Sequence, residues 1–203
     1  MNNLISIKKI SKSFSNNKKV TVLKNIDYSF AKGKIYSLMG PSGSGKSTLL
    51  NILSMIDKPT TGLLLIGGEK IDFNDSIVND KIRSKKIGII YQQNNLLPDF
   101  TALENVYFAR LALSNDKKNS IQKAKKIIKE MGLTSREHHY PSELSGGEMQ
   151  RIAMARALIN EPEVILADEP TGSLDQKTAN EVFKILYNLK NKNRLIIYAT
   201  HNR

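Results

Sequence analysis

The sequence from residue 40 to residue 48 reads Gly40-Pro41-Ser42-Gly43-Ser44-Gly45-Lys46-Ser47-Thr48. A short, largely apolar stretch at residues 34–39 precedes it as a predicted strand, and apolar residues at helical spacing follow it. A glycine-rich turn between a strand and a helix suits phosphate, because glycine lets N–H groups point inward and the helix N-terminus is partly positive. We therefore predict that residues 40–48 bind nucleotide phosphates, with Lys46 at the β- and γ-phosphates and Ser47 ligating Mg²⁺.

The composition fits a folded protein without membrane spans of its own. The chain has 203 residues, of which 40% are hydrophobic, enough for one compact domain or one domain with a small subdomain. The net charge of +12 would suit nucleic acid or an anionic membrane, but the basic residues are spread along the chain, which favours a solvated surface. Cysteine is absent, no signal-peptide pattern is present, and the apolar runs fall far short of the ~20 residues that span a bilayer. We expect a soluble intracellular chain whose partners supply any membrane spans.

Strand and helix patterns alternate along the chain and predict an α/β fold. The N-terminal part predicts antiparallel strands and a hairpin across Gly67-Gly68, and a helical segment of about residues 94–145 then interrupts the alternation. The chain is thus predicted to be a single domain, residues 1–203, with a helical insertion. The strands are expected at residues 4–7, 20–23, 26–30, 34–39, 63–66, 69–73, 87–91, 164–167 and 195–199, and a C-terminal helix at residues 177–190.

Two helices are expected within the inserted segment. Thr101 and Glu104 have the spacing of a capping box, which predicts a helix that runs through Leu113. Ser120 is the predicted cap of a second helix, which Gly132 ends.

Two carboxylates follow a buried strand near the C-terminus. Asp168 and Glu169 come directly after the apolar residues 164–167. Ligands of doubly wound sheets lie at the carboxyl ends of the strands, so both carboxylates are expected to face the phosphate loop. We predict that Asp168 holds Mg²⁺, usually through water, and that Glu169 orients or deprotonates an attacking water.

A second glycine-rich helix start is the most specific stretch in the chain. Residues 144–151 read Leu-Ser-Gly-Gly-Glu-Met-Gln-Arg, with Ser145 and Glu148 in capping-box register. Gly146 and Gly147 remove side chains from the open helix end, so that backbone N–H groups can approach a phosphate.

Together these motifs resemble the ATP-binding subunits of ABC transporters, and the resemblance runs along nearly the whole chain. It implies a P-loop NTPase (RecA-like) core with an antiparallel β subdomain and a helical insertion subdomain, and it implies ATP and Mg²⁺ as ligands. In that family two copies pack head to tail, and each ATP lies between the phosphate loop of one copy and the signature helix of the other. Ser145, Gly146, Gly147 and Glu148 would therefore serve the nucleotide of the partner copy. The resemblance implies a homodimer that drives two transmembrane permease subunits by hydrolysing ATP.

Four further residues take roles from the positions they match in the family. Gln92 resembles the glutamine that contacts Mg²⁺ and the attacking water, with Gln93 as a weaker candidate. Asp175 resembles the aspartate that communicates across the dimer, and His201 resembles the histidine that contacts the γ-phosphate. Phe14 stands where an aromatic ring commonly stacks on adenine, and a core phenylalanine is the alternative.

A narrower similarity points to one branch of the family. Residues 91–106 are similar to the lipoprotein-releasing ATPases of Gram-negative bacteria, and residues 167–175 fit their wider group of macrolide-type exporters and cell-division ATPases. The similarity implies a peripheral protein on the cytoplasmic face of the inner membrane that drives lipoprotein release. The alternatives are an ATPase of another peptide or drug exporter, a regulatory ATPase of the cell-division type, and a nucleic-acid ATPase, which only the basic charge supports. The chain ends soon after His201, with Asn202 where aspartate is common, so we expect a truncated or short C-terminal end.

Overall fold

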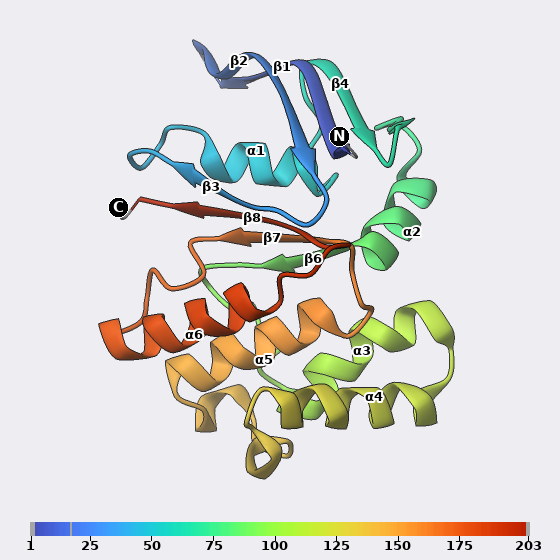
Figure 1. The fold of residues 1–203 in the computed structure, drawn as a ribbon, viewed down its shortest axis with the longest axis vertical. Coiled ribbons are helices and arrows are strands. Elements are labelled where there is room, and N and C mark those ends of the chain that lie inside the picture. The colour runs from blue at the N-terminus through green and yellow to red at the C-terminus, as the bar shows by residue number, and fades with distance from the viewer. Residues whose placement is uncertain (1–2, 17, 202–203) are drawn as a thin grey trace.

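The computed structural model describes residues 3–16 and 18–201 of the chain (Figure 1). Its elements are, in order, β1 (Asn3–Asn16), β2 (Lys18–Ala31), β3 (Ile35–Met39), α1 (Lys46–Leu53), β4 (Thr61–Ile66), β5 (Glu69–Lys70), α2 (Ser76–Lys86), β6 (Ile87–Ile90), α3 (Ala102–Ser114), α4 (Lys117–Glu130), the 3₁₀ helices η1 (Thr134–Arg136) and η2 (Pro141–Glu143), α5 (Gly146–Leu158), β7 (Val164–Asp168), α6 (Gln176–Asn188) and β8 (Leu195–Thr200). Within this part of the chain no helix is both long and apolar enough to cross a membrane.

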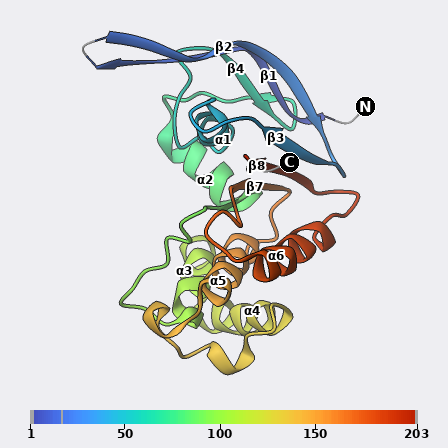
Figure 2. The same ribbon diagram turned by 90° about the vertical axis from the view of Figure 1, so that its left-hand side faces the viewer.

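The strands form two sheets, as the sequence predicts. The antiparallel sheet has the order β2-β1-β4-β5, and the parallel sheet has the order β3-β8-β7-β6. Figures 1 and 2 show the layers: α1 lies between the two sheets, α5 and α6 lie on the other face of the parallel sheet, and α3 and α4 pack beyond them against α5. The fold is therefore a P-loop-type α/β core that carries an antiparallel β part and a group of helices.

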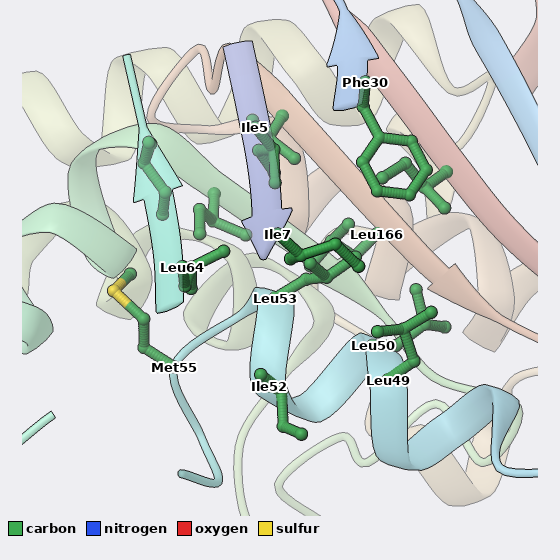
Figure 3. Packing of buried hydrophobic residues seen from close by; sticks show 14 of the residues in the cluster. Ile5, Ile7, Phe30, Leu49, Leu50, Ile52, Leu53, Met55, Leu64 and Leu166 are labelled. Atoms are coloured by element: carbon green, nitrogen blue, oxygen red, sulfur yellow. The ribbon is translucent and has the colours of Figure 1, made fainter. Parts of the chain in front are cut away.

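Strand β7 shows how the parallel sheet separates two hydrophobic cores. Successive side chains of a strand point to opposite faces, so Val164 and Leu166 pack with α1 and the antiparallel sheet, while Ile165 and Ala167 pack with the helices. Figure 3 shows the first of these cores, where Leu166 lies among residues of α1, β1 and β4. Burial on both faces fixes the position of β7 between the two cores. It therefore also fixes the position of the carboxylates at the end of this strand.

The sheet brings four loops together at one edge. All four strands of β3-β8-β7-β6 are parallel, so their carboxyl ends meet at the same edge. The loop of residues 40–45 follows β3, Glu169 follows β7, His201 follows β8, and Gln92 lies in the loop after β6.

Several local expectations were wrong or incomplete; the strand expected at residues 4–7 extends from residue 3 to residue 16 as β1, and the one expected at 69–73 ends at Lys70 as β5. The predicted strands at residues 20–23 and 26–30 are one strand, β2, because the positive φ of Asn25 (46°) gives an irregularity in the pairing with β1 and does not end the strand. Asp116, not Ser120, caps α4; Ser120 is buried inside that helix, with its hydroxyl 3.2 Å from that of Ser114. The sequence pattern did not reveal α2, which is strongly polar and buries only Asn79.

Candidate nucleotide-binding and hydrolysis site

The turn between β3 and α1 has the backbone that an anion-binding loop needs. Gly45 adopts φ 92° at the start of α1, and a Cβ there would lie 2.9 Å from the Leu23 side chain, so only glycine fits. Among the described residues no side chain caps α1 and no acidic residue lies in its first turn, which leaves its N–H donors open to a ligand. Residues 41–44 and Ser47 are exposed, so the loop is accessible from solvent.

Lys46 lies inside this loop. Its Nζ donates to the carbonyl oxygens of Gly40 at 2.8 Å and Pro41 at 3.0 Å, and it lies 4.0 Å from Oε1 of Glu169. The Lys46 side chain is only 9% exposed. Its two hydrogen-bond partners are neutral carbonyls, which do not cancel the positive charge of the ammonium. The loop therefore presents a positive charge to a phosphate.

Glu169 joins the loop to the end of β8. Its backbone has φ 44°, its N–H donates to the carbonyl oxygen of Ala199 at 3.1 Å, and its Oε2 lies 2.9 Å from Nδ1 of His201. A left-handed backbone is uncommon for a residue other than glycine, and such residues cluster at functional sites.

Asp168 and Ser47 fit the hard ligands that Mg²⁺ prefers. Oδ1 of Asp168 is buried and has no hydrogen-bond partner among the described residues. A buried carboxylate oxygen without a partner is costly unless a cation or an ordered water satisfies it. This orphaned acceptor supports the assignment of Asp168 to a cation, directly or through water.

Gln92 reaches the same place from β6. A Cβ at Gly172 would lie 2.9 Å from Nε2 of Gln92 and 3.3 Å from Oε2 of Glu169, so both side chains lie against the Gly172 backbone. The structure thus brings Lys46, Gln92, Glu169 and His201 together at the carboxyl edge of the parallel sheet.

The second glycine-rich motif forms a separate helix end. Ser145 and Glu148 form the predicted capping box at the start of α5, and Nε of Arg136 lies 3.0 Å from Oε1 of Glu148. The hydrogen bond from the Ser145 backbone N–H, together with Arg136, lowers the pKa of Glu148. Figure 1 shows that this end of α5 and the loop before α1 open on the same side of the molecule, with the parallel sheet and α6 between them.

Gly147 has a structural role that its motif did not predict. A Cβ at this position would lie 2.3 Å from Cγ2 of Thr178, so the glycine lets α5 and α6 approach each other closely. Thr178 in turn donates from Oγ1 to Asp175 at 2.6 Å. Asp175 caps α6, and the hydrogen bonds from the Thr178 side chain and backbone lower the pKa of this carboxylate.

Phe14 lies apart from both groups, on the β1–β2 hairpin. Its side chain is 45% exposed, and Nζ of Lys12 lies 4.9 Å from the ring centroid. The alternative of a core phenylalanine is therefore wrong, and the exposed ring is available for stacking. Asn202 lies outside the described residues.

Sequence reasoning missed the residues that hold these motifs in place. Arg136 fixes Glu148, and two side chains of α5, Gln150 and Arg156, hold the loop that contains Gln92. Each acts through contacts between segments distant in sequence, which no local spacing encodes.

Comparisons with known proteins agree with this geometry. The family model described as ABC transporter matches residues 23–172. The chain is 45% identical to the lipoprotein-releasing system ATP-binding protein LolD of Rickettsia bellii, over 99% of this chain and 90% of that protein. It is 43% identical to the LolD of Legionella pneumophila, over 100% of this chain and 91% of the relative. The solved dimeric structure of the ATP-binding cassette MJ0796 in a post-hydrolysis state with ADP and Pi superposes with a TM-score of 0.90, at 38% identity, over 98% of this chain and 88% of that one. The chain belongs to the ABC transporter family, as one of its ATP-binding, ATP-hydrolysing subunits.

Proposed function

We propose that this ATPase works as a homodimer that drives two transmembrane permease subunits and thereby releases lipoproteins from the bacterial inner membrane. Lipoprotein release rests on the relatives, which are named for that system at 42–47% identity. Dimerisation is supported by the dimeric MJ0796 structures. On this proposal the chain lies peripherally at the cytoplasmic face of that membrane, bound through its permease partners.

The observation that carries the catalytic part is the grouping of Lys46, Glu169 and His201. Lys46 and the open N-terminus of α1 bind the β- and γ-phosphates, with the loop of residues 40–45 around them. Glu169 accepts a proton from the attacking water, and His201 holds the Glu169 carboxylate and contacts the γ-phosphate.

The remaining site residues have three roles: some would hold Mg²⁺, one stacks on the adenine ring, and others contact the nucleotide that the partner copy holds. Asp168, Ser47 and Gln92 would hold Mg²⁺, which neutralises phosphate charge when it is bound. Phe14 stacks on adenine, and Thr48 completes the phosphate loop. Ser145, Gly146, Gly147 and Glu148 present the N-terminus of α5 to the γ-phosphate held by the other copy, and Asp175 lies at the contact between copies. Within the single domain of residues 1–203, we assign about residues 94–145 to the helical insertion subdomain.

The experiment is an affinity purification of the tagged chain from detergent-solubilised native membranes, with mass spectrometry of the proteins that co-purify. We expect two multi-span permease subunits, and ATP-dependent release of a lipoprotein when the complex is reconstituted in proteoliposomes. A permease complex that exports a drug or peptide and releases no lipoprotein would contradict the assigned cargo. A partner of the cell-division type, with no transported cargo, would support the regulatory alternative instead.

A further inference from the structure

The loop that contains Gln92 is held by the helix that begins at the second glycine-rich motif. Nε2 of Gln150 donates to the carbonyl oxygen of Tyr91 at 3.1 Å. The guanidinium of Arg156 donates from Nη1 to the carbonyl oxygen of Asn95 and from Nη2 to that of Asn94, both at 2.6 Å. Gln92 thus lies between carbonyls that are bound, on both sides, by side chains of α5.

Burial makes these bonds structurally important. Gln150 is 2% exposed, and burial lowers the pKa of the Arg156 guanidinium and raises the pKa of the nearby Tyr91 hydroxyl. Loss of Gln150 or Arg156 would leave the part-buried carbonyl oxygen of Tyr91 or Asn94 unpaired, which costs more than the loss of a solvent-exposed hydrogen bond.

Helix α5 also lies directly on the strand that leads into the loop. A Cβ at Gly88 of β6 would come within 2.4 Å of the carbonyl oxygen of Ala157, so the strand and the helix are in close backbone contact. The hydrogen bonds and this close packing join β6, the loop of residues 91–95 and α5 into one unit.

We propose that Gln150 and Arg156 are positioning residues that transmit the position of the α5 N-terminus to Gln92. Because β6, the loop and α5 form one unit, the helix that a partner copy engages at Ser145 also holds Gln92 in place for the Mg²⁺ and the attacking water. This inference rests on the proposed roles of Gln92 and of the α5 end.

The competing explanation is that Gln150 and Arg156 only stabilise the fold and have no effect on Gln92. Arg194 provides a matched control for this explanation. Arg194 also donates to two carbonyl oxygens, those of Pro162 at 3.1 Å and Leu189 at 3.2 Å, and burial lowers its pKa in the same way. Arg194 lies before β8. Within the part of the chain that the structure describes, its side-chain hydrogen bonds do not reach the loop that contains Gln92. Arg194→Met thus removes the same chemistry from another loop.

The test compares Arg156→Met, Arg156→Lys, Gln150→Met and Arg194→Met for ATP turnover as a function of Mg²⁺ concentration. We expect Arg156→Met and Gln150→Met to lower kcat about tenfold and to raise the Mg²⁺ concentration for half-maximal turnover, with nucleotide affinity unchanged. Arg156→Lys should fall between, because one ammonium replaces the fork of two donors. In a Gln92→Ala background Arg156→Met should cause no further loss, since it acts through Gln92. Additive losses in that background, or the same Mg²⁺ effect in Arg194→Met, would overturn the proposal.

A second measurement tests the positioning role of Arg156 independently of ATP hydrolysis. Hydrogen exchange of the 203-residue chain should be about tenfold faster at the amides around residues 91–97 in Arg156→Met, with no such change in Arg194→Met. Unchanged exchange in that loop would refute the positioning role. If the wild type failed to hydrolyse ATP, the proposed function would fail, and the exchange result would still decide whether α5 holds the loop.

Discussion

Nδ1 of His201 lies 2.9 Å from Oε2 of Glu169, although the two residues follow different strands of the parallel sheet. The same carboxylate has its other oxygen 4.0 Å from Nζ of Lys46. Glu169 is therefore placed between the lysine of the phosphate loop and the histidine at the end of β8. That placement is the geometric basis for assigning it the proton from the attacking water.

Replacing Glu169 with Gln should abolish turnover and keep ATP binding. The amide is nearly isosteric and can still contact His201, but it cannot accept the proton, so we expect kcat to fall at least about a hundredfold. Steady-state ATP hydrolysis and equilibrium nucleotide binding measure the two effects. Glu163→Gln, at a partly exposed ion pair with Lys32, is the control. Wild-type turnover in Glu169→Gln would remove this residue from the catalytic role.

Replacing Lys46 with Ala should weaken nucleotide binding. The ammonium is the buried positive charge inside the loop, and charge-assisted contacts to phosphate make large contributions to affinity. We expect the Kd for ATP to rise by about tenfold or more, measured by calorimetry. Lys32→Ala removes the same charge from a partly exposed ion pair and should leave the Kd unchanged. An unaltered Kd in Lys46→Ala would contradict the phosphate assignment.

Replacing Gly147 with Ala should destabilise the protein through helix packing. The new methyl would meet Cγ2 of Thr178 at 2.3 Å, and overpacking typically costs about 1–3 kcal/mol, more than the helix propensity gained. Thr178→Ser removes that methyl and keeps a hydroxyl for Asp175. The double variant should therefore recover most of the free energy of unfolding, measured by urea denaturation. Equal loss in the single and double variants would show that another contact limits this position.

Replacing Glu148 with Gln should change how stability depends on pH. The fold lowers the pKa of Glu148 below its usual 4.5, so the ionised carboxylate adds stability that is complete above that value and disappears as pH falls through the lowered pKa. We expect the wild type to exceed the variant by about 0.5–1 kcal/mol at neutral pH.

That difference in free energy of unfolding should shrink in acid. Denaturation series that run from neutral pH into acid, below the usual carboxyl pKa, measure it. Glu130→Gln, at the exposed C-terminal end of α4, controls for the loss of one negative charge. A difference that stays constant with pH would mean that the charge of Glu148 does not contribute.

Local signals predicted most of the fold, since they are carried by residues close in sequence. The capping boxes at Thr101 and Ser145 both start helices where expected, and the strand before Asp168 is buried on both faces. Helix α2 was missed because its polar sequence has little apolar periodicity. The prediction that Ser120 caps α4 was wrong because Asp116 caps this helix four residues earlier. The ends of strands in a parallel sheet predicted that Glu169 faces the loop of Lys46, whereas His201 was assigned to this site only from its resemblance to ABC transporter subunits.

Contacts between distant segments could not be predicted in the same way. The packing of Gly147 on Thr178, and the bonds from Gln150 and Arg156 to the Gln92 loop, depend on how α5 lies on its neighbours. The spacing of residues in the sequence does not indicate how closely α5 packs against α6 or against the loop that contains Gln92.

The molar mass of Glu169→Gln with and without saturating ATP and Mg²⁺ tests the central claim most directly. Two copies should enclose two nucleotides, each between the phosphate loop of one copy and the α5 end of the other. Light scattering after size exclusion should then give twice the 22.8 kDa of one chain with ATP, and a single chain without it. A nucleotide-bound protein that stays monomeric at high concentration would contradict the account.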